Sequence, residues 1–296
     1  MDASANFDPF DPPYDVLAPG TTMAPVVFAS PHSGNLYPDS FISAARLDAL
    51  SLRRSEDAFI DELFTSAPTL GMPLIRARFP RAYVDVNREP WELDPGMFTD
   101  RLPDYVNHAS PRANAGLGTI ARVVASGSEI YASKLRFSEA KRRIETLYMP
   151  YHARLVGMLR ELEKAWPATL LIDCHSMPST PGPLDRGQSR RRVDFVIGDC
   201  HGQSCMRAIT DLVERTLRDI GYVVMRNDPY AGGFTTRHYG RPDEGRHALQ
   251  IEINRALYMD EQLIARKPYF STLARNLTHL VGAVREFTRA GFTKLA

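Results

Sequence analysis

The chain has 296 residues, of which 44% are apolar and 24% are charged, and its formal net charge is +1. This length and composition fit one large α/β domain with a sizeable buried core. The near-neutral charge lacks the basic footprint of a nucleic-acid binder, so no nucleic acid is expected as a partner. No run of about 18 apolar residues occurs, so no membrane span and no membrane partner are expected.

The cysteine pattern and the N-terminus predict a cytoplasmic protein. The three cysteines, Cys174, Cys200 and Cys205, are odd in number and show no paired spacing. Such a pattern argues against a disulfide scaffold and favours a reducing compartment. The N-terminus lacks a basic start followed by an apolar stretch, so no signal peptide is expected. The oligomeric state cannot be predicted from these features.

The N-terminal half alternates short apolar runs with amphipathic stretches. Continuous apolar runs are typical of strands buried on both faces, whereas apolar residues recurring every three or four positions indicate helices. In chain order, the patterns predict an extended arm over residues 1–24, a strand over Val26–Ser30, a short helix over 38–49, a helix over Asp57–Leu70, strands over Pro73–Phe79 and Ala82–Val86, and a turn-rich segment over 91–128. Long irregular segments of this kind often carry binding loops.

The C-terminal half continues the alternation of strands and helices. In chain order, the patterns predict a long helix over 129–149 that continues over 150–165, a strand over Thr169–Asp173, a loop over 176–189, a strand over Val193–Ile197, a helix over 203–219, a strand over Tyr222–Met225, a loop over 227–247, a strand over Ala248–Ile253 and a mostly helical segment over 259–289. The alternation predicts an α/β fold in a single domain over 25–296, with a mostly parallel or mixed central sheet and helices on both faces.

Two histidines follow predicted strands in similar sequence contexts. His32 lies in Ser30-Pro31-His32-Ser33-Gly34, and His175 lies in Asp173-Cys174-His175-Ser176. Ligands of open α/β sheets bind at the carboxyl ends of the strands. Imidazole is a preferred zinc ligand, and a catalytic zinc site has three protein ligands and an open position. The pair therefore predicts a shared metal, with a purely structural role for each histidine as the alternative.

A carboxylate is the usual third ligand of such a hydrolytic site, and Glu56 and Asp57 are the candidates. Both lie at the predicted start of a helix, where an acidic residue also caps the backbone and complements the helix dipole. The pattern alone leaves this choice open.

Glu252 is a candidate general base. It interrupts the apolar strand Leu249-Gln250-Ile251-Glu252-Ile253, so it should point away from the core if Leu249, Ile251 and Ile253 face that core. A buried carboxylate is energetically costly unless it has a charged partner or a catalytic role. Partial burial also raises the pKa of a carboxyl toward neutral pH, which suits a general base. The alternative is a buried salt bridge to Arg255 or Arg241.

Polar side chains at two further places could bind an anionic substrate. Asn87 and Arg88 end a predicted strand, and arginine can grip a carboxylate in two places. A structural ion pair of Arg88 with Asp85 or Glu89 is the alternative. The glycine-rich segment 230–242 carries Arg237 and Arg241 and could fold over a bound anion, although this signal is weak alone.

The ordered set of these segments resembles the N-formylglutamate amidohydrolase family. The segments are Ser30 to Gly34, Ser55 to Asp57, Arg81 to Arg88, Pro150 to His152, Asp173 to Ser176, Gly198 to Cys205, Gly232 to Pro242 and Gln250 to Arg255. They run in the family's order from about residue 26 to residue 261. The family is distantly similar to the zinc carboxypeptidases, which implies a zinc-exopeptidase-like fold.

The resemblance implies one zinc ion, with other divalent metals as alternatives, held by His32, Asp57 and His175. The His-x-x-Glu pattern of carboxypeptidases is missing, because Ser33, Gly34 and Asn35 follow His32, and Asp57 falls where the family has aspartate. The resemblance implies Glu252 as the base. It implies that Asp85, Asn87 and Arg88 hold a substrate carboxylate, and that Arg81, Arg237 or Arg241 meets a second one.

The implied reaction is hydrolysis of an N-acyl amino acid, with the acidic small molecule N-formyl-L-glutamate as type substrate and formate and L-glutamate as products. A related zinc amidase or carboxypeptidase-like deacylase with another substrate is the first alternative. A non-catalytic binding protein that keeps the cleft is the second. A serine hydrolase is disfavoured, because no Gly-x-Ser-x-Gly elbow occurs.

Overall fold

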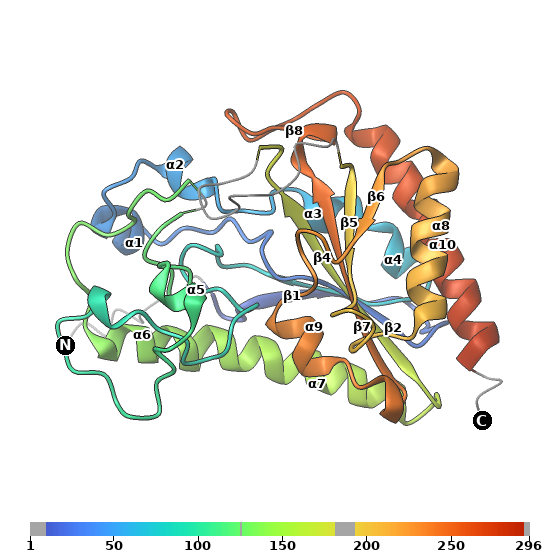
Figure 1. Cartoon of the computed structure of the whole chain (residues 1–296), viewed down its shortest axis with the longest axis horizontal. Coiled ribbons are helices and arrows are strands. Elements are labelled where there is room, and N and C mark those ends of the chain that lie inside the picture. The colour runs from blue at the N-terminus through green and yellow to red at the C-terminus, as the bar shows by residue number, and fades with distance from the viewer. Residues whose placement is uncertain (1–9, 125, 181–192, 293–296) are drawn as a thin grey trace, which may run out of the picture.

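A seven-stranded mixed sheet forms the centre of the computed structural model, which describes residues 10–124, 126–180 and 193–292 (Figure 1). The strands are Tyr14–Leu17 (β1), Val26–Ser30 (β2), Leu74–Ala77 (β3), Thr169–Met177 (β4), Phe195–Gly198 (β5), Val224–Arg226 (β6) and Arg246–Asn254 (β7). Their order is β1-β3-β2-β4-β7-β5-β6. The central strands β3, β2, β4 and β7 are parallel, whereas β1 at one edge and β5 with β6 at the other are antiparallel to them. The predicted α/β class with a mixed sheet is confirmed.

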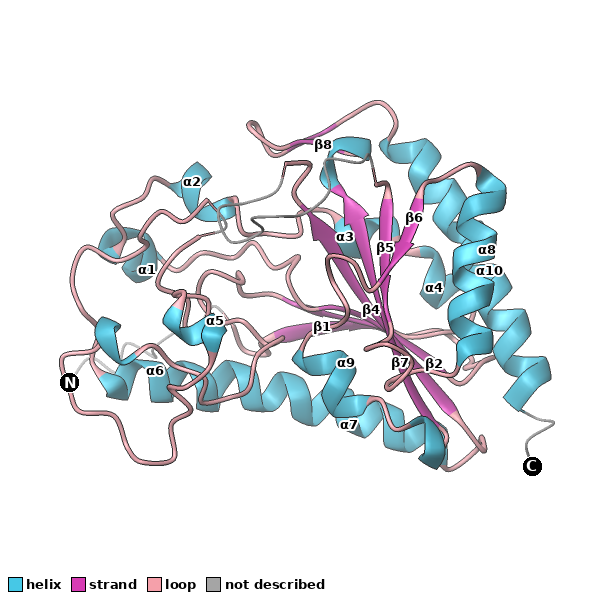
Figure 2. Cartoon of the chain, in the orientation of Figure 1, coloured by secondary structure: helices cyan, strands magenta, loops and turns pink. Residues whose placement is uncertain are grey.

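Helices cover both faces of this sheet, as predicted (Figure 2). The α-helices are Asp39–Ala44 (α1), Ala49–Arg53 (α2), Ile60–Leu63 (α3), Ser66–Thr69 (α4), Pro111–Asn114 (α5), Phe137–Arg143 (α6), Met149–Glu163 (α7), Arg207–Ile220 (α8), Phe234–Tyr239 (α9) and Phe270–Phe292 (α10). A small second sheet pairs Met259–Asp260 (β8) with Ala265–Arg266 (β9). Across the described ranges, no helix combines the length and the apolar character that a membrane crossing needs.

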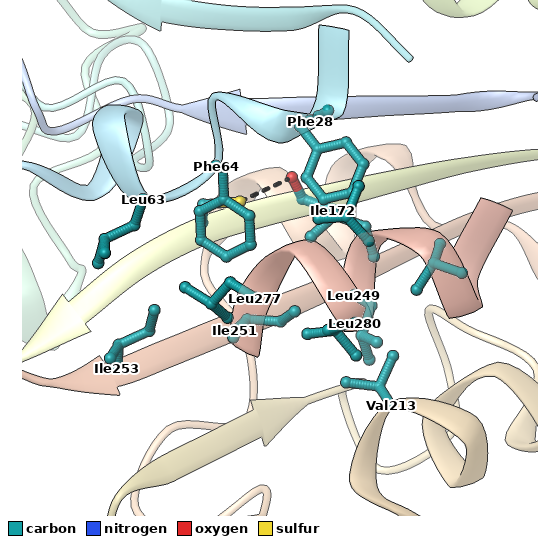
Figure 3. Packing of buried hydrophobic residues seen from close by; sticks show 14 of the residues in the cluster. Phe28, Leu63, Phe64, Ile172, Val213, Leu249, Ile251, Ile253, Leu277 and Leu280 are labelled. Atoms are coloured by element: carbon teal, nitrogen blue, oxygen red, sulfur yellow. Dashed lines mark hydrogen bonds between the residues drawn. The ribbon is translucent and has the colours of Figure 1, made fainter. Parts of the chain in front are cut away.

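The alternation of side chains along each strand divides the core into two layers. Phe28, Ile172 and Leu249 point to the face covered by α8 and α10, as Figure 3 shows, whereas their neighbours Val27 and Leu171 pack on the α7 face. Each central strand is therefore apolar on both sides, which explains its continuous apolar sequence.

The same alternation decides where polar residues of the central strands point. Ile251 and Ile253 of β7 belong to the core on the α10 face (Figure 3), so Glu252 between them points to the other face. Cys174 of β4 lies in the same α10-side core, and its neighbour His175 pairs with Glu252 in the strand register. The predicted orientation of Glu252, away from the core of its apolar neighbours, is confirmed.

The segment Ala82–Val86 is not a strand, contrary to the prediction. Tyr83 and Val84 both donate a backbone hydrogen bond to the carbonyl of Pro80, as in a turn, and Asp85 donates to the carbonyl of Thr119. The apolar side chains of this segment are buried in the core on the α7 face. A short apolar run indicates that the segment is buried, but it does not by itself distinguish a strand from a buried turn.

The helix predicted over Asp57–Leu70 is wrong as a single element, because it divides into α3 and α4. Asp57 precedes the first turn, and Phe59 has a left-handed φ of 67°, so the chain enters the helix only at Ile60. The capping role weighed for Asp57 therefore does not apply, since no side-chain cap is present at the start of α3.

The helix predicted over 129–149 begins only at Phe137. It continues past Pro150 into α7, as expected, through a π-helical turn over Ile144–Tyr148. Pro150 is accommodated because it stands in the first turn of α7.

Tertiary pairing extends or adds several elements. The predicted arm over 1–24 contains β1, and the predicted loop over 227–247 contains α9. Residues 181–189 of the predicted loop over 176–189 lie outside the described residues. The last helix begins at Phe270 instead of near 259. Strand β4 runs on to Met177 because β7 offers backbone partners along its whole length, so His175 lies within the strand and not beyond it.

We expect Leu277→Ala to lower the free energy of unfolding by about 2–5 kcal/mol, because it leaves a cavity in the core on the α10 face. Urea denaturation followed by circular dichroism measures this change. Leu263→Ala is the matched control, since Leu263 is 69% exposed on the turn between β8 and β9 and should change stability by less than about 0.5 kcal/mol. Equal losses in both variants would contradict the assigned core.

Candidate active site

His32, Asp57 and His175 meet at the carboxyl edge of the central sheet. His32 lies two residues after β2. His175 lies near the carboxyl end of the neighbouring strand β4. One nitrogen from each ring and one carboxylate oxygen of Asp57 all lie within 4.8 Å of one another, and all three residues are buried. The predicted approach of the two imidazoles is confirmed, and the group could hold a metal ion.

Asp57 is held so that one carboxylate oxygen faces both rings. Its Oδ1 accepts hydrogen bonds from Arg255 Nη2 and from Ser176 Oγ, each at 3.0 Å. Its Oδ2 lies 3.3 Å from His32 Nδ1 and 3.1 Å from His175 Nδ1. The fixed Oδ1 thus leaves Oδ2 as the third atom of the group.

Glu56 is turned away from the two histidines. Its carboxylate accepts hydrogen bonds from Arg53 Nε at 3.0 Å and from Tyr37 Oη at 2.7 Å. The sequence left open whether Glu56 or Asp57 is the carboxylate beside the two histidines. In the structure this residue is Asp57.

The outer nitrogen of each histidine faces a second carboxylate. His32 Nε2 lies 2.8 Å from Asp85 Oδ1, and His175 Nε2 lies 2.9 Å from Asp173 Oδ2. The His32–Asp85 contact is a hydrogen bond, and an outer carboxylate of this kind orients a metal-binding histidine, keeps the proton on its outer nitrogen and leaves the inner nitrogen free as a ligand. Asp173 lies close to His175 without a hydrogen bond to it. His32 Nδ1 is buried without a hydrogen-bond partner among the described residues, so the arrangement fits a cation at the centre of the group.

The electrostatics of the group favour charged forms. Burial alone would raise the pKa of Asp57, but the neighbouring His175 and His32 hold it well below its usual range. Burial would likewise raise the pKa of Asp85, but Arg81 and His32 hold it well below its usual range. Both carboxylates thus stay ionised at neutral pH, which favours a bound cation.

Glu252 lies beside this group without a salt bridge. It is 8% exposed, and its Oε1 accepts a hydrogen bond from Gln250 Nε2 at 2.8 Å. Among the described residues it has no ion-pair partner within 4.0 Å, because Arg255 pairs with Asp57 and Arg241 donates to backbone carbonyls. The alternative of a buried salt bridge is therefore wrong. Burial raises the pKa of Glu252 to about 7, despite the opposing effect of His175.

A cavity of about 640 Å³ opens at this group. The predicted site residues that line it are His32, Arg81, Asn87, Arg88, His175, Arg237 and Glu252. Asp57 lies behind the two rings, fully buried. Arg241 does not line the cavity, and its guanidinium bonds to the carbonyls of Arg237 and Gly240.

The segment after Pro80 contributes differently from the expectation based on the carboxypeptidases. Asp85 lines the cavity as well, but it accepts from His32 and, at 3.0 Å, from Arg81 Nε, so both of its oxygens are engaged within the site. Arg88 Nε donates to the carbonyl of Leu117 at 2.9 Å and lies 3.8 Å from Asp85. The ion pair weighed for Arg88 with Asp85 is thus present, although long.

His152 fixes the backbone beside Asn87. Its Nε2 donates to the carbonyl of Val86 at 2.8 Å, so its Nδ1 accepts from Tyr239 Oη at 2.6 Å. Burial lowers the pKa of His152 to about 4, which keeps the ring neutral as this pattern requires. The ring joins α7 to α9 and to the cavity wall.

Three residues at the site were missed by the sequence analysis. Arg112 lines the cavity from the turn-rich segment 91–128, is exposed, and has no side-chain partner among the described residues. Asp173 and Gln250 are buried polar residues within otherwise apolar strands. That interruption is the same signal that singled out Glu252, so it could have found both of them.

The fold and the site together define an α/β protein with a buried group that could hold a metal ion and a buried carboxyl of raised pKa at one cavity, an arrangement typical of hydrolases. The sequence pattern of the family described as N-formylglutamate amidohydrolase matches residues 24–259. The chain belongs to this family.

Individual relatives agree with this assignment. The chain is 29% identical over 240 residues to the N-formylglutamate deformylase of Pseudomonas putida, covering 80% of this chain and 82% of the relative. The crystal structure of N-formylglutamate amidohydrolase from Ralstonia eutropha JMP134 superposes with a TM-score of 0.90 at 38% identity, covering 94% of this chain and 99% of that one. The gene product Atu2144 from Agrobacterium tumefaciens shares the fold, with a TM-score of 0.64 at 20% identity over 92% of this chain and 94% of that one.

We expect His32→Ala, His175→Ala and Asp57→Asn to lose bound metal, because each removes one of the converging atoms. Elemental analysis of the purified variants, with wild type at about one ion per chain, measures this loss. Glu56→Gln is the matched control for Asp57→Asn, and the exposed His279→Ala is the control for the histidines. Metal content that is the same in all five variants would rule out this group as the metal site.

Proposed function

We propose that the chain hydrolyses N-formyl-L-glutamate to formate and L-glutamate at the cavity of His32, His175 and Glu252, with one zinc ion held by His32, Asp57 and His175. The observation that carries the proposal is the convergence of three buried ligand atoms within 4.8 Å beside a carboxyl base, in a chain of this family. Relatives with this activity in their names support the choice of substrate.

The ligand set supports zinc. Two imidazole nitrogens and one carboxylate oxygen are a common set for catalytic zinc, which keeps an open position for water or substrate. Bound zinc would polarise the formyl carbonyl and lower the pKa of a coordinated water to about 7. His32 and His175 would bind it through Nδ1, since Asp85 and Asp173 occupy the outer nitrogens.

Glu252 would move the proton in this reaction. Gln250 holds its Oε1, so Oε2 is the oxygen left to accept a proton from the attacking water. The same oxygen would deliver that proton to the departing amine nitrogen of glutamate. A carboxyl whose pKa is raised to about 7 by burial suits both transfers near neutral pH.

Four residues of the cavity would bind the two carboxylates of the substrate. Arg88 donates hydrogen bonds from Nε and Nη1 to backbone carbonyls. Its Nη2, together with Asn87 Nδ2, would therefore donate to one substrate carboxylate. Arg112 and Arg237 line the same cavity without an acidic partner within 4.0 Å among the described residues, and they would meet the other. Arg81 would act through Asp85, to which it is bonded.

We expect Glu252→Gln to keep the metal and to lose turnover of N-formyl-L-glutamate by about 10²–10⁴-fold, because the amide cannot accept the proton. Formate release followed by proton NMR measures turnover, and elemental analysis measures the metal. Glu286→Gln, on the exposed face of α10, is the matched control. Wild-type turnover in Glu252→Gln would remove Glu252 as the base. A wild-type chain without bound zinc, and inactive after zinc addition, would instead favour a non-catalytic binding protein.

We expect Arg112→Ala and Arg237→Ala each to raise KM for N-formyl-L-glutamate by about tenfold or more, because each loses a charge-assisted hydrogen bond. N-formyl-L-norvaline, which lacks the side-chain carboxylate, is the comparison substrate. If Arg112 and Arg237 meet that carboxylate, kcat/KM for N-formyl-L-norvaline should change little in both variants. Arg101→Ala, with a side chain that is 92% exposed, is the matched control. Unchanged KM in both variants would exclude these arginines from substrate binding.

A further inference from the structure

Gln250 bridges the carboxylate of Glu252 and the start of α9. It lies two residues before Glu252 on β7, is 4% exposed, and points to the same face of the sheet. Its Oε1 accepts hydrogen bonds from the backbone nitrogen of Gly233 at 2.7 Å and from Thr236 Oγ1 at 3.4 Å. Its Nε2 donates to Glu252 Oε1 at 2.8 Å. Both ends of the amide are therefore engaged.

The contact with Gly233 fixes which way the amide points. A backbone nitrogen can only donate, so the oxygen of Gln250 must face Gly233. The nitrogen must then face Glu252, and it offers that carboxylate a donor. The direction of the bond to Glu252 thus follows from the backbone partner alone.

Asn87 makes the corresponding arrangement on the other side of the same segment. Its Oδ1 accepts from the backbone nitrogen of Thr235 at 2.9 Å, and its Nδ2 lies 3.2 Å from His175 Nε2. A Cβ atom at Gly233 would collide with the Asn87 amide, so only glycine allows the segment to lie this close. Two side-chain amides thus fix the start of α9, which carries Arg237, against the chemical centre.

We propose that Gln250 is a positioning residue, whose Nε2 holds Oε1 of Glu252 so that Oε2 faces the cavity, and whose Oε1 ties this carboxylate to the α9 segment. The inference rests on the proposed role of Glu252 as the base. Glu252 has no ion pair among the described residues, so this hydrogen bond adds a directional contact to the packing around its buried side chain. A neutral amide can do so without adding the positive charge that would weaken the carboxylate as a proton acceptor.

The test is Gln250→Met, which keeps the length of the side chain and removes all three of its hydrogen bonds. A base displaced by about 1 Å loses up to about 100-fold in rate, so kcat should fall by about 10–100-fold. Metal content should stay at the wild-type value, and so, within about twofold, should the Kd for L-glutamate measured by titration calorimetry. Gln262→Met, at an exposed position between β8 and β9, is the matched control and should leave kcat unchanged.

A double-mutant cycle separates positioning of Glu252 from a general structural role. If Gln250 acts through Glu252, adding Gln250→Met to Glu252→Gln causes no further loss of kcat. If Gln250→Met lowers kcat by the same factor in the wild-type and in the Glu252→Gln background, the inference is overturned. Loss of metal from Gln250→Met would overturn it as well, and so would a weaker Kd for L-glutamate together with a wild-type kcat. Wild-type kcat in Gln250→Met beside an inactive Glu252→Gln overturns the inference alone. Wild-type turnover in Glu252→Gln overturns the proposed base, and this inference with it.

Discussion

The burial of the Asp57 carboxylate between two imidazoles is the interaction on which the rest of the site depends. A fully buried carboxylate is costly unless partners stabilise its charge. Arg255 and Ser176 fix one oxygen, and His32 and His175 lie around the other. Because these partners come from three distant segments of the chain, the loop after β2 and the ends of β4 and β7 have to meet at one point.

A second layer of polar residues keeps this centre in place. Asp85 and Asp173 face the outer nitrogens of the two histidines, and Arg81 neutralises Asp85 in turn. The opposite face of the sheet packs apolar side chains against α8 and α10 (Figure 3), so it gives the site a rigid support. Polar contacts on one face of the sheet and close apolar packing on the other thus hold the His32, Asp57 and His175 side chains near one another.

The cavity combines a buried carboxyl and two imidazoles with several guanidinium groups. Glu252, His32 and His175 line it together with arginines from separate segments of the chain. The start of α9 links these groups, because Gln250 and Asn87 bond to it from either side while it carries Arg237. The carboxyl of Glu252 and the guanidinium of Arg237 are therefore connected through one short segment.

The sequence by itself determined most of the alternation of strands and helices, the placement of two histidines toward the carboxyl ends of apolar strands, and the orientation of Glu252. These follow from local periodicity, and the period of two along a strand fixes which face a residue takes. The tertiary structure alone decided that Asp57 and not Glu56 joins the histidines, that Asp85 supports His32, that Ala82–Val86 is a buried turn, and that Arg112 reaches the cavity while Arg241 does not. Those features depend on which distant segments face one another, and a local pattern carries no information about its partners across space.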